Sequence, residues 1–267
     1  MIKLGLCAWM LPMEEEETFA FAGRLGFDGI AIELKYKDGS FHLSDKEKQK
    51  KYLELAKENN VVIATFALNT LCDKDHGMSN KEDHETVFDI IDKAVEIAED
   101  MGVKTFQFPS FFASDITNEE EFNNTVTCFK YACEKVKGKD IKIGWENTMD
   151  KDNNLLMLER VNSDDFFIYY DTQNPVSFSN LDNVQLAKDL VGSVKEIHAK
   201  DSLEDLSAEL YIWEGIANFK EVMEVFRDNN YSGWIIIENL YKAFKNYENI
   251  IKKDREFIID LMSGKIK

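Results

Sequence analysis

The chain alternates short apolar runs, rich in β-branched and aromatic residues, with longer amphipathic runs that carry most of the charge. Eight apolar runs have the length and composition of buried strands, at residues 2–9, 28–34, 61–68, 104–108, 141–147, 166–172, 194–200 and 234–239. Eight amphipathic runs have helical spacing, at residues 14–25, 44–59, 82–101, 117–137, 154–161, 183–190, 218–229 and 242–262. Gly26, Gly102 and Gly138 are the predicted C-terminal caps, and Ser44 and Thr117 the predicted N-terminal caps.

Strict alternation of strand and helix predicts a parallel sheet, because parallel strands need a crossover connection. Eight such units in about 250 residues close a barrel, so the predicted fold class is α/β, a single (β/α)8 TIM barrel. A doubly wound open sheet is the alternative, but the first strand ends Cys7-Ala8-Trp9-Met10 without a glycine-rich phosphate turn. Nothing resembling a linker interrupts the chain, so one domain over residues 1–267 is expected.

Composition narrows the possible partners. The 267 residues are 44% hydrophobic, enough for a large core, and 32 basic against 50 acidic residues give a net charge of −18. Such a chain repels nucleic-acid phosphates and anionic membranes, so neither partner is expected. No Arg/Lys cluster typical of a phosphate site stands out, which favours an unphosphorylated substrate. A homo-oligomer is compatible with the sequence.

The four cysteines and the first apolar run bear on location. No two cysteines form a C-x-x-C pair, and four are too few for a disulfide framework in this length of chain. Reduced thiols in a cytoplasmic protein are therefore expected. Residues 4–13 could pass for a signal sequence, but only Lys3 precedes them and residues 14–17 are all glutamate, so a buried strand is expected.

Four consecutive predicted strands end in groups that can bind a metal. Active sites of such barrels lie at the C-terminal ends of the strands, and the four groups there are Glu146, Asp171, His198 and Glu238. Alone, each acid could be a solvated loop residue and the histidine a core residue. If all four point inward, three carboxylates need a compensating cation. Oxygen ligands with one imidazole suit Mn²⁺, Mg²⁺ or Co²⁺, with Zn²⁺ also compatible.

Lys200 lies two residues after His198 and therefore shares its face of the strand. It is predicted either to grip a substrate oxygen or to form an ion pair with Glu196 or with a carboxylate of the metal site. Asp201 is expected to cap the following loop or to orient Lys200.

Aromatic residues lie at or beyond several strand ends. Trp9 and Trp213 are candidates for a pocket wall that stacks on a substrate ring, whereas Phe66 and Trp145 are expected in the core. Glu214, in the loop before the seventh helix, is a candidate to contact the substrate or a metal-bound water.

Several segments together resemble a known family. They are Leu-Gly-Phe-Asp-Gly-Ile at 25–30, His-Ala-Lys-Asp at 198–201, Trp-Glu-Gly-Ile-Ala-Asn-Phe at 213–219, and Tyr-Ser-Gly-Trp at 231–234 leading to Glu238. The chain resembles the xylose isomerase-like TIM-barrel family, which includes sugar isomerases, ketose 3-epimerases, inosose dehydratases and apurinic endonucleases.

The resemblance implies one divalent ion held by Glu146, Asp171, His198 and Glu238, with Mn²⁺ the first candidate. In the epimerase branch the two glutamates also transfer protons on opposite faces of a carbon next to a carbonyl. The ion stabilises the enediolate that forms when the proton leaves.

The chain departs from the epimerase pattern at three positions that hold substrate. Asn174 stands where epimerases tend to carry histidine, Asp152 where they tend to carry glutamate, and Glu204 where they tend to carry arginine. Asn174 thus becomes a candidate substrate-binding residue. The endonuclease branch uses three zinc ions and many histidines, whereas this chain has four histidines in all and a charge of −18.

The prediction is a divalent-metal-dependent isomerase or epimerase of carbohydrate metabolism. It would act on a small sugar, polyol or sugar derivative by proton abstraction next to a carbonyl. One alternative is a metal-dependent dehydratase of a keto-cyclitol, such as an inosose or a dehydroshikimate-like substrate. A second is a sugar-binding barrel without catalytic activity.

Overall fold

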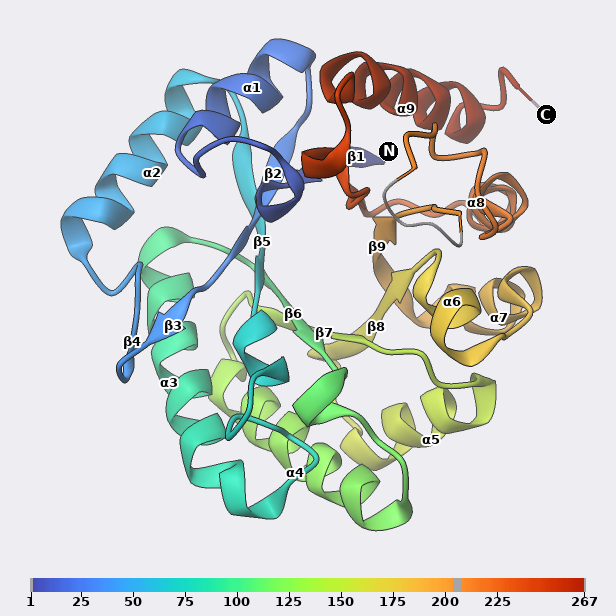
Figure 1. Cartoon of the computed structure of the whole chain (residues 1–267). Coiled ribbons are helices and arrows are strands. Elements are labelled where there is room, and N and C mark those ends of the chain that lie inside the picture. The colour runs from blue at the N-terminus through green and yellow to red at the C-terminus, as the bar shows by residue number, and fades with distance from the viewer. Residues whose placement is uncertain (1, 204–207, 267) are drawn as a thin grey trace.

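Eight parallel strands close into a barrel in the computed structural model, which describes residues 2–203 and 208–266 (Figure 1). Around the barrel their order is β1-β10-β9-β8-β7-β6-β5-β2, so strands from both ends of the chain pair with each other. The strands are β1 (Lys3–Cys7), β2 (Gly29–Glu33), β5 (Val62–Ala67), β6 (Thr105–Pro109), β7 (Lys142–Glu146), β8 (Phe166–Asp171), β9 (Val194–Ala199) and β10 (Trp234–Ile237). The predicted (β/α)8 barrel is confirmed.

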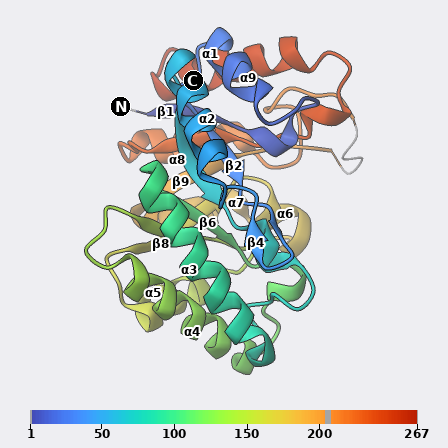
Figure 2. The ribbon, with the colours of Figure 1, turned by 90° about the vertical axis from the view of Figure 1, so that its left-hand side faces the viewer.

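Helices form a ring around these strands, and α2 and α3 lie in front of the barrel in the side view of Figure 2. They are α1 (Glu17–Leu25), α2 (Lys46–Glu58), α3 (His84–Met101), α4 (Glu119–Val136), α5 (Lys151–Val161), α6 (Asn174–Ser179), α7 (Asn183–Leu190), α8 (Phe219–Asp228) and α9 (Tyr247–Met262). Their buried apolar faces pack on the barrel, as the amphipathic pattern predicts. No helix in the described part of the chain combines the length and apolar composition that a bilayer crossing requires.

Two predicted N-terminal caps, Ser44 and Thr117, are each one residue too early. The α2 cap is Asp45, whose carboxylate accepts the Glu47 N–H at 2.9 Å. The α4 cap is Asn118, which accepts the Glu121 N–H at 3.0 Å, while Thr117 donates its hydroxyl to the Glu121 carboxylate. Each pair offers two adjacent capping side chains, and only the backbone path decides which one faces the free N–H groups.

Two elements are absent from the sequence prediction. A small hairpin, β3 (Tyr36–Lys37) and β4 (Ser40–Phe41), turns at Asp38-Gly39, where both residues have positive φ. This Asp-Gly pair is a known hairpin signal, although the strands beside it are too short to show a period of two. The other element is α6, six residues with Pro175 in its first turn.

The barrel interior below the mouth is packed with aromatic side chains. A Cβ on Gly144 would lie 2.6 Å from the Phe167 ring, so the glycine leaves room for Phe167 and Tyr169 beneath the strand ends. Phe66 and Trp145 are fully buried, as expected of core residues.

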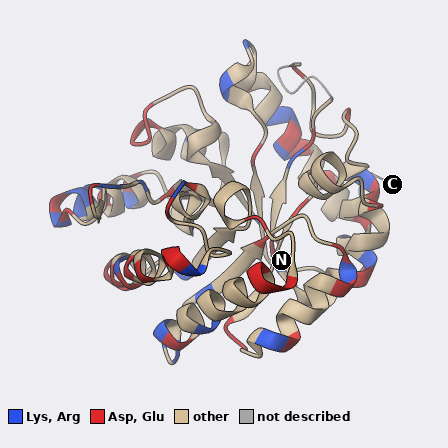
Figure 3. Ribbon diagram, turned by 60° about the horizontal axis from the view of Figure 1, so that its bottom comes forward, with Lys and Arg blue, Asp and Glu red and all other residues tan. Residues whose placement is uncertain are grey.

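Charged residues of both signs lie mainly on the outer helices and loops (Figure 3), and those on the barrel strands stand mostly at the first or last position of a strand. One bidentate pair joins α1 to α9 through Arg24 and Glu248. Exposed pairs of this kind contribute little to stability, because water and salt screen their charges. The acids at the mouth of the barrel differ from this exposed pair because they are buried.

Candidate metal and substrate site

Four ligand-type side chains converge at the C-terminal mouth of the barrel. Glu146 ends β7, Asp171 ends β8, His198 lies one residue before the end of β9, and Glu238 follows β10. Asp171 pairs with His198 in the sheet register, and His198 with Ile236, which brings these strand ends to one level. One ligand atom from each of the four residues lies within 4.8 Å of all the others, and all four residues are buried. We call these four residues the mouth cluster.

His198 occupies the centre of the mouth cluster. Its Nδ1 lies 3.3 Å from Glu146 Oε1 and 3.4 Å from Glu238 Oε2. Burial disfavours the charged imidazole, but the Glu238 and Glu146 carboxylates hold the pKa of His198 well above its usual value. The Tyr169 ring meets the imidazole edge-on with centroids 4.5 Å apart. His198 is thus fixed by packing and turns Nδ1 toward the acids.

Asp171 is held by one oxygen and leaves the other free. Its Oδ1 accepts the N–H groups of Gln173 at 2.7 Å and Asn174 at 2.6 Å. Its Oδ2 is buried without a hydrogen-bond partner among the described residues. Burial raises the pKa of Asp171 to about 7, and the Glu146 and Glu238 charges add to this rise while Lys200 opposes it. A buried, unpartnered carboxylate oxygen costs at least about 1–3 kcal/mol, which a bound cation would recover.

Glu146 is clamped from two sides. Its Oε1 accepts from Asn174 Nδ2 at 3.2 Å, and its Oε2 accepts from the Gln107 amide on β6. Burial raises the pKa of Glu146, but the His198 and Lys200 charges and the Gln107 bond outweigh this and lower it. Gln107 was missed by sequence reasoning, although a polar residue inside the apolar run Phe106–Phe108 was an available signal.

Glu238 contacts two of the residues that are candidates for substrate binding. Its Oε1 accepts from Trp9 Nε1 at 3.1 Å, and its Oε2 lies 3.3 Å from Lys200 Nζ. Lys200 also donates to Asn174 Oδ1 at 3.3 Å, so Trp9, Lys200 and Asn174 all border the mouth cluster. Of the ion pairs expected for Lys200, the one with a cluster carboxylate forms. Glu196 instead accepts from the Thr65 hydroxyl at 2.6 Å.

Charge balance in the mouth is incomplete. Three carboxylates face the single ammonium of Lys200, whose side chain is 24% exposed. A protonated His198 would leave one negative charge in excess, and a neutral His198 would leave two. Among the described residues, the site therefore matches a divalent cation in both donor type and charge.

The partners that the structure shows for Trp213 and Glu214 lie outside the mouth cluster. Trp213 stacks on Tyr211 and packs against Phe257 of α9, with ring centroids 4.8 and 4.3 Å apart. The Glu214 carboxylate accepts the Tyr211 N–H. The physical reason is a tether: the buried Asp254 of α9 accepts the Ile212 N–H at 2.9 Å and draws the loop toward that helix.

The other positions that depart from the epimerase pattern lie elsewhere. Asp152 is exposed in the first turn of α5, and Glu204 lies outside the described residues. Asp201 caps its loop, as expected, by accepting the N–H groups of Ser202, Gly215 and Ala217.

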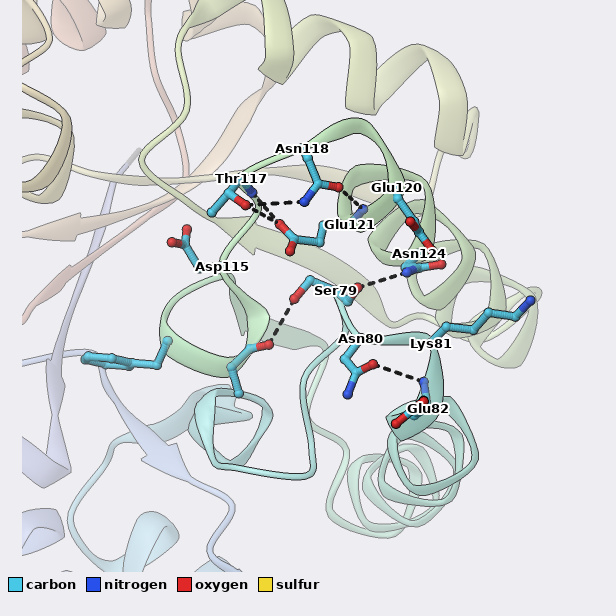
Figure 4. Close-up of a pocket in the computed structure, with 12 residues that line it drawn as sticks. Ser79, Asn80, Lys81, Glu82, Asp115, Thr117, Asn118, Glu120, Glu121 and Asn124 are labelled. Atoms are coloured by element: carbon cyan, nitrogen blue, oxygen red, sulfur yellow. Dashed lines mark hydrogen bonds between the residues drawn. The ribbon is translucent and has the colours of Figure 1, made fainter.

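A separate hollow of about 860 Å³ lies between the 79–82 segment and the start of α4 (Figure 4). Its polar groups bond one another: the Ser79 hydroxyl donates to the Ala113 carbonyl, and Asn124 donates to the Ser79 carbonyl. Asn80 and Asn118 cap the turns beside it. These polar groups already have hydrogen-bond partners, and their bonds join the 79–82 segment to its neighbours. No residue of the mouth cluster lines this hollow.

Two enzymes of known activity are similar to this chain in sequence. It is 24% identical over 226 residues to a 2-epi-5-epi-valiolone 7-phosphate 2-epimerase from Actinoplanes sp., covering 84% of this chain and 82% of the relative. It is also 24% identical over 155 residues to an inosose dehydratase from Clostridium tetani, covering 49% of this chain and 51% of the relative.

Among solved structures, an L-ribulose 3-epimerase superposes with a TM-score of 0.79 at 16% identity, covering 99% of this chain and 95% of the other. This likeness concerns the fold. Residues 19–261 match the family described as the xylose isomerase-like TIM barrel. The chain therefore belongs to the xylose isomerase-like TIM-barrel family.

Proposed function

We propose that this protein is a divalent-metal-dependent epimerase of a small sugar or sugar derivative, acting by proton abstraction next to a carbonyl. The observation that carries the proposal is the mouth cluster: three buried carboxylates and an imidazole whose ligand atoms lie within 4.8 Å of one another, with no hydrogen-bond partner for Asp171 Oδ2 in the described part of the chain. The residues that would hold the ion are Glu146, Asp171, His198 and Glu238. Mn²⁺ is the first ion to test, followed by Mg²⁺, Co²⁺ and Zn²⁺.

The two glutamates are suited to proton transfer from different sides of one substrate. Glu146 belongs to β7 and Glu238 follows β10, with β8 and β9 between them in the barrel. One glutamate, as the carboxylate, takes the α-proton, and the other, entering as the carboxylic acid, gives a proton to the opposite face, which inverts the carbon and exchanges the protonation states of the two glutamates. Gln107 and Asn174 orient Glu146, while Trp9 and Lys200 orient Glu238.

The chemistry that a bound ion supplies is polarisation of the carbonyl and stabilisation of the negative charge that develops on its oxygen. Lys200 contributes a second positive charge at the same mouth, where its ammonium reaches Asn174 and Glu238. Trp9 offers an apolar face beside Glu238. Together these groups bind and orient a polyhydroxylated carbonyl compound.

A keto-cyclitol dehydratase is the second candidate. The two sequence relatives are a valiolone-phosphate epimerase and an inosose dehydratase, and both names describe compounds derived from cyclitols. Dehydration begins with the same proton abstraction, after which a β-hydroxyl leaves with a proton. Lys200, an ammonium near the mouth, is the group in position to give that proton.

The test is solvent deuterium uptake at carbon. Metal-loaded protein is incubated in D₂O with ketoses and with keto-cyclitols, each with and without a phosphate, and the products are analysed by NMR. Deuterium gain without new ultraviolet absorbance indicates epimerisation, and loss of water to a conjugated enone indicates dehydration. Sugar binding without exchange in any metal-loaded sample would instead favour the non-catalytic barrel.

We further propose a cytoplasmic setting. Cys7, Cys72, Cys128 and Cys133 are all free thiols in the structure, as a reducing compartment maintains them.

A further inference from the structure

Cys7 is the one thiol that contacts the mouth cluster among the described residues. It ends β1, its side chain is buried, and its Sγ lies 3.7 Å from His198 Nε2. β10 separates β1 from β9 in the barrel, so this contact crosses the barrel interior. The other buried thiols have different partners; Cys128 Sγ, for example, donates to the Met78 carbonyl.

The contact matters because an imidazole has two different nitrogens. Nδ1 of His198 faces Glu146 and Glu238, and Nε2 faces Cys7. In metal-binding histidines the second nitrogen is generally held by a carboxylate, a backbone carbonyl or water, and that bond fixes the tautomer. Here a sulfur atom occupies that position, and its burial leaves little room for a substitute water.

Packing against neighbouring aromatic rings cannot by itself determine which nitrogen of the His198 imidazole carries the hydrogen. The Tyr169 and Trp9 rings meet the imidazole edge-on, with centroids 4.5 and 6.2 Å away. Such contacts limit tilting but do not distinguish a nitrogen from a carbon at the ring edge. Polar contacts on both ring nitrogens make that distinction.

We propose that Cys7 is a positioning residue, whose sulfur accepts the Nε2–H of His198 and keeps Nδ1 turned toward the acids of the mouth cluster. Its role as a metal-site positioner rests on the proposed function, whereas the hydrogen bond itself does not. Cys7 touches neither ion nor substrate in this role.

Two substitutions separate the hydrogen bond from the packing. Cys7→Val keeps a similar volume and removes the acceptor, so His198 Nε2–H loses its partner inside the core. Cys7→Ser keeps an acceptor. Loss of a partner to a ligating histidine typically weakens metal binding by about 10–100-fold. We expect Cys7→Val to weaken Co²⁺ binding by about tenfold and Cys7→Ser to change it by less than about threefold.

The first measurement is a Co²⁺ titration of the metal-stripped full chain. Calorimetry reports the affinity, and the visible spectrum reports the coordination of the bound ion. Cys128→Val is the matched control, because it alters a buried thiol that touches no cluster residue, and we expect it to bind Co²⁺ like the wild type. Thermal melting reports on folding separately. Equal Co²⁺ affinity and spectra for wild type and Cys7→Val would overturn the positioning role.

The second measurement does not use metal. The chain has only four histidines, so their ring N–H signals can be resolved by NMR of the metal-free protein and assigned with His198→Gln. We expect a slowly exchanging His198 Nε2–H signal that moves in Cys7→Val and persists in Cys7→Ser.

Absence of that signal in the wild type would overturn the hydrogen bond, whether or not Cys7→Val folds. A wild type that binds no Co²⁺ but shows the signal would refute the proposed metal site and the positioning role that depends on it, and would leave the Cys7–His198 bond established.

Discussion

Two clusters that bring a carboxylate against a histidine differ in whether the carboxylates have enough hydrogen-bond donors and positive charges around them. In the first, Glu15 accepts from His42 at 3.0 Å and from Tyr52 at 2.7 Å, and pairs with Lys35 at 3.2 Å. Burial would raise the pKa of Glu15, but these bonds and charges lower it to about 2. In the mouth cluster, three acids share one imidazole and one ammonium, and Asp171 Oδ2 has no partner among the described residues.

The comparison shows that acid–histidine contact alone does not mark a functional site. The Glu15 cluster (Glu15, Lys35, His42 and Tyr52) has enough donors for its single carboxylate, so it stabilises the fold and needs no ligand. The mouth cluster has more hydrogen-bond acceptors than donors and an excess of negative charge. Burying that charge is unfavourable without a counterion, so a bound cation would stabilise the cluster.

The largest expected difference between the two clusters is in activity. Glu146→Gln and Glu238→Gln each remove a proton-transfer group, and general acid–base contributions are typically about 10²–10⁴-fold. We expect kcat to fall by at least about 100-fold in each variant and by less than about twofold in the control Glu15→Gln. Rates of deuterium exchange on the identified substrate provide the measurement. Full activity in both mouth variants would refute the mechanism.

Glu15→Gln should instead lower stability. The folded-state pKa of about 2 lies below the ordinary value of 4.5, so the Glu15 contribution is present above pH 4.5 and is lost as the pH falls toward 2. By linkage, a shift from 4.5 to about 2 is worth about 3 kcal/mol. Urea unfolding of wild type and Glu15→Gln at pH 7 should differ by that amount, and the difference should shrink in acid. A difference independent of pH would contradict the assignment.

Substitution of Trp9 should lower activity by less than substitution of either glutamate. Trp9→Phe keeps a ring but removes the Nε1–H that Glu238 accepts. We expect kcat to fall by at least about tenfold, since loss of a hydrogen bond to a charged group is worth about 1.5–3 kcal/mol. Trp213→Phe is the matched control: this ring packs on Phe257, and activity should stay within about twofold. Equal losses in both would place Trp213 in the functional site after all.

Asp171→Asn should have the smallest effect on stability and one of opposite sign. The folded pKa of about 7 lies above the ordinary 3.8, so ionisation of Asp171 destabilises the metal-free fold as the pH rises from about 4 to 7. An amide keeps the oxygen that accepts two N–H groups and removes the buried charge. By linkage the buried charge costs up to about 4 kcal/mol at pH 8, and the new amide N–H groups, buried without a known partner, offset about 1–3 kcal/mol of this. We therefore expect metal-free Asp171→Asn to gain about 1 kcal/mol in urea unfolding and to lose metal affinity. Destabilisation of the metal-free variant would contradict this account.

Local sequence determined much of the protein. Alternation of apolar strands with amphipathic helices is a local property, so the barrel and the strand ends bearing Glu146, Asp171, His198 and Glu238 could be predicted without a structure. The caps were less certain because Ser44 and Asp45, or Thr117 and Asn118, offer the same chemistry at adjacent positions.

Only the tertiary structure decided how these side chains are connected. Trp9 meets Glu238 across 229 positions and Cys7 meets His198 across 191, and no local pattern encodes such contacts. Trp213 is a residue that the sequence suggested for the site, but the bond from the Ile212 N–H to Asp254 holds its loop against α9. Chain propensities act over a few residues, whereas the partner of each buried polar atom depends on which strands the closed barrel brings face to face.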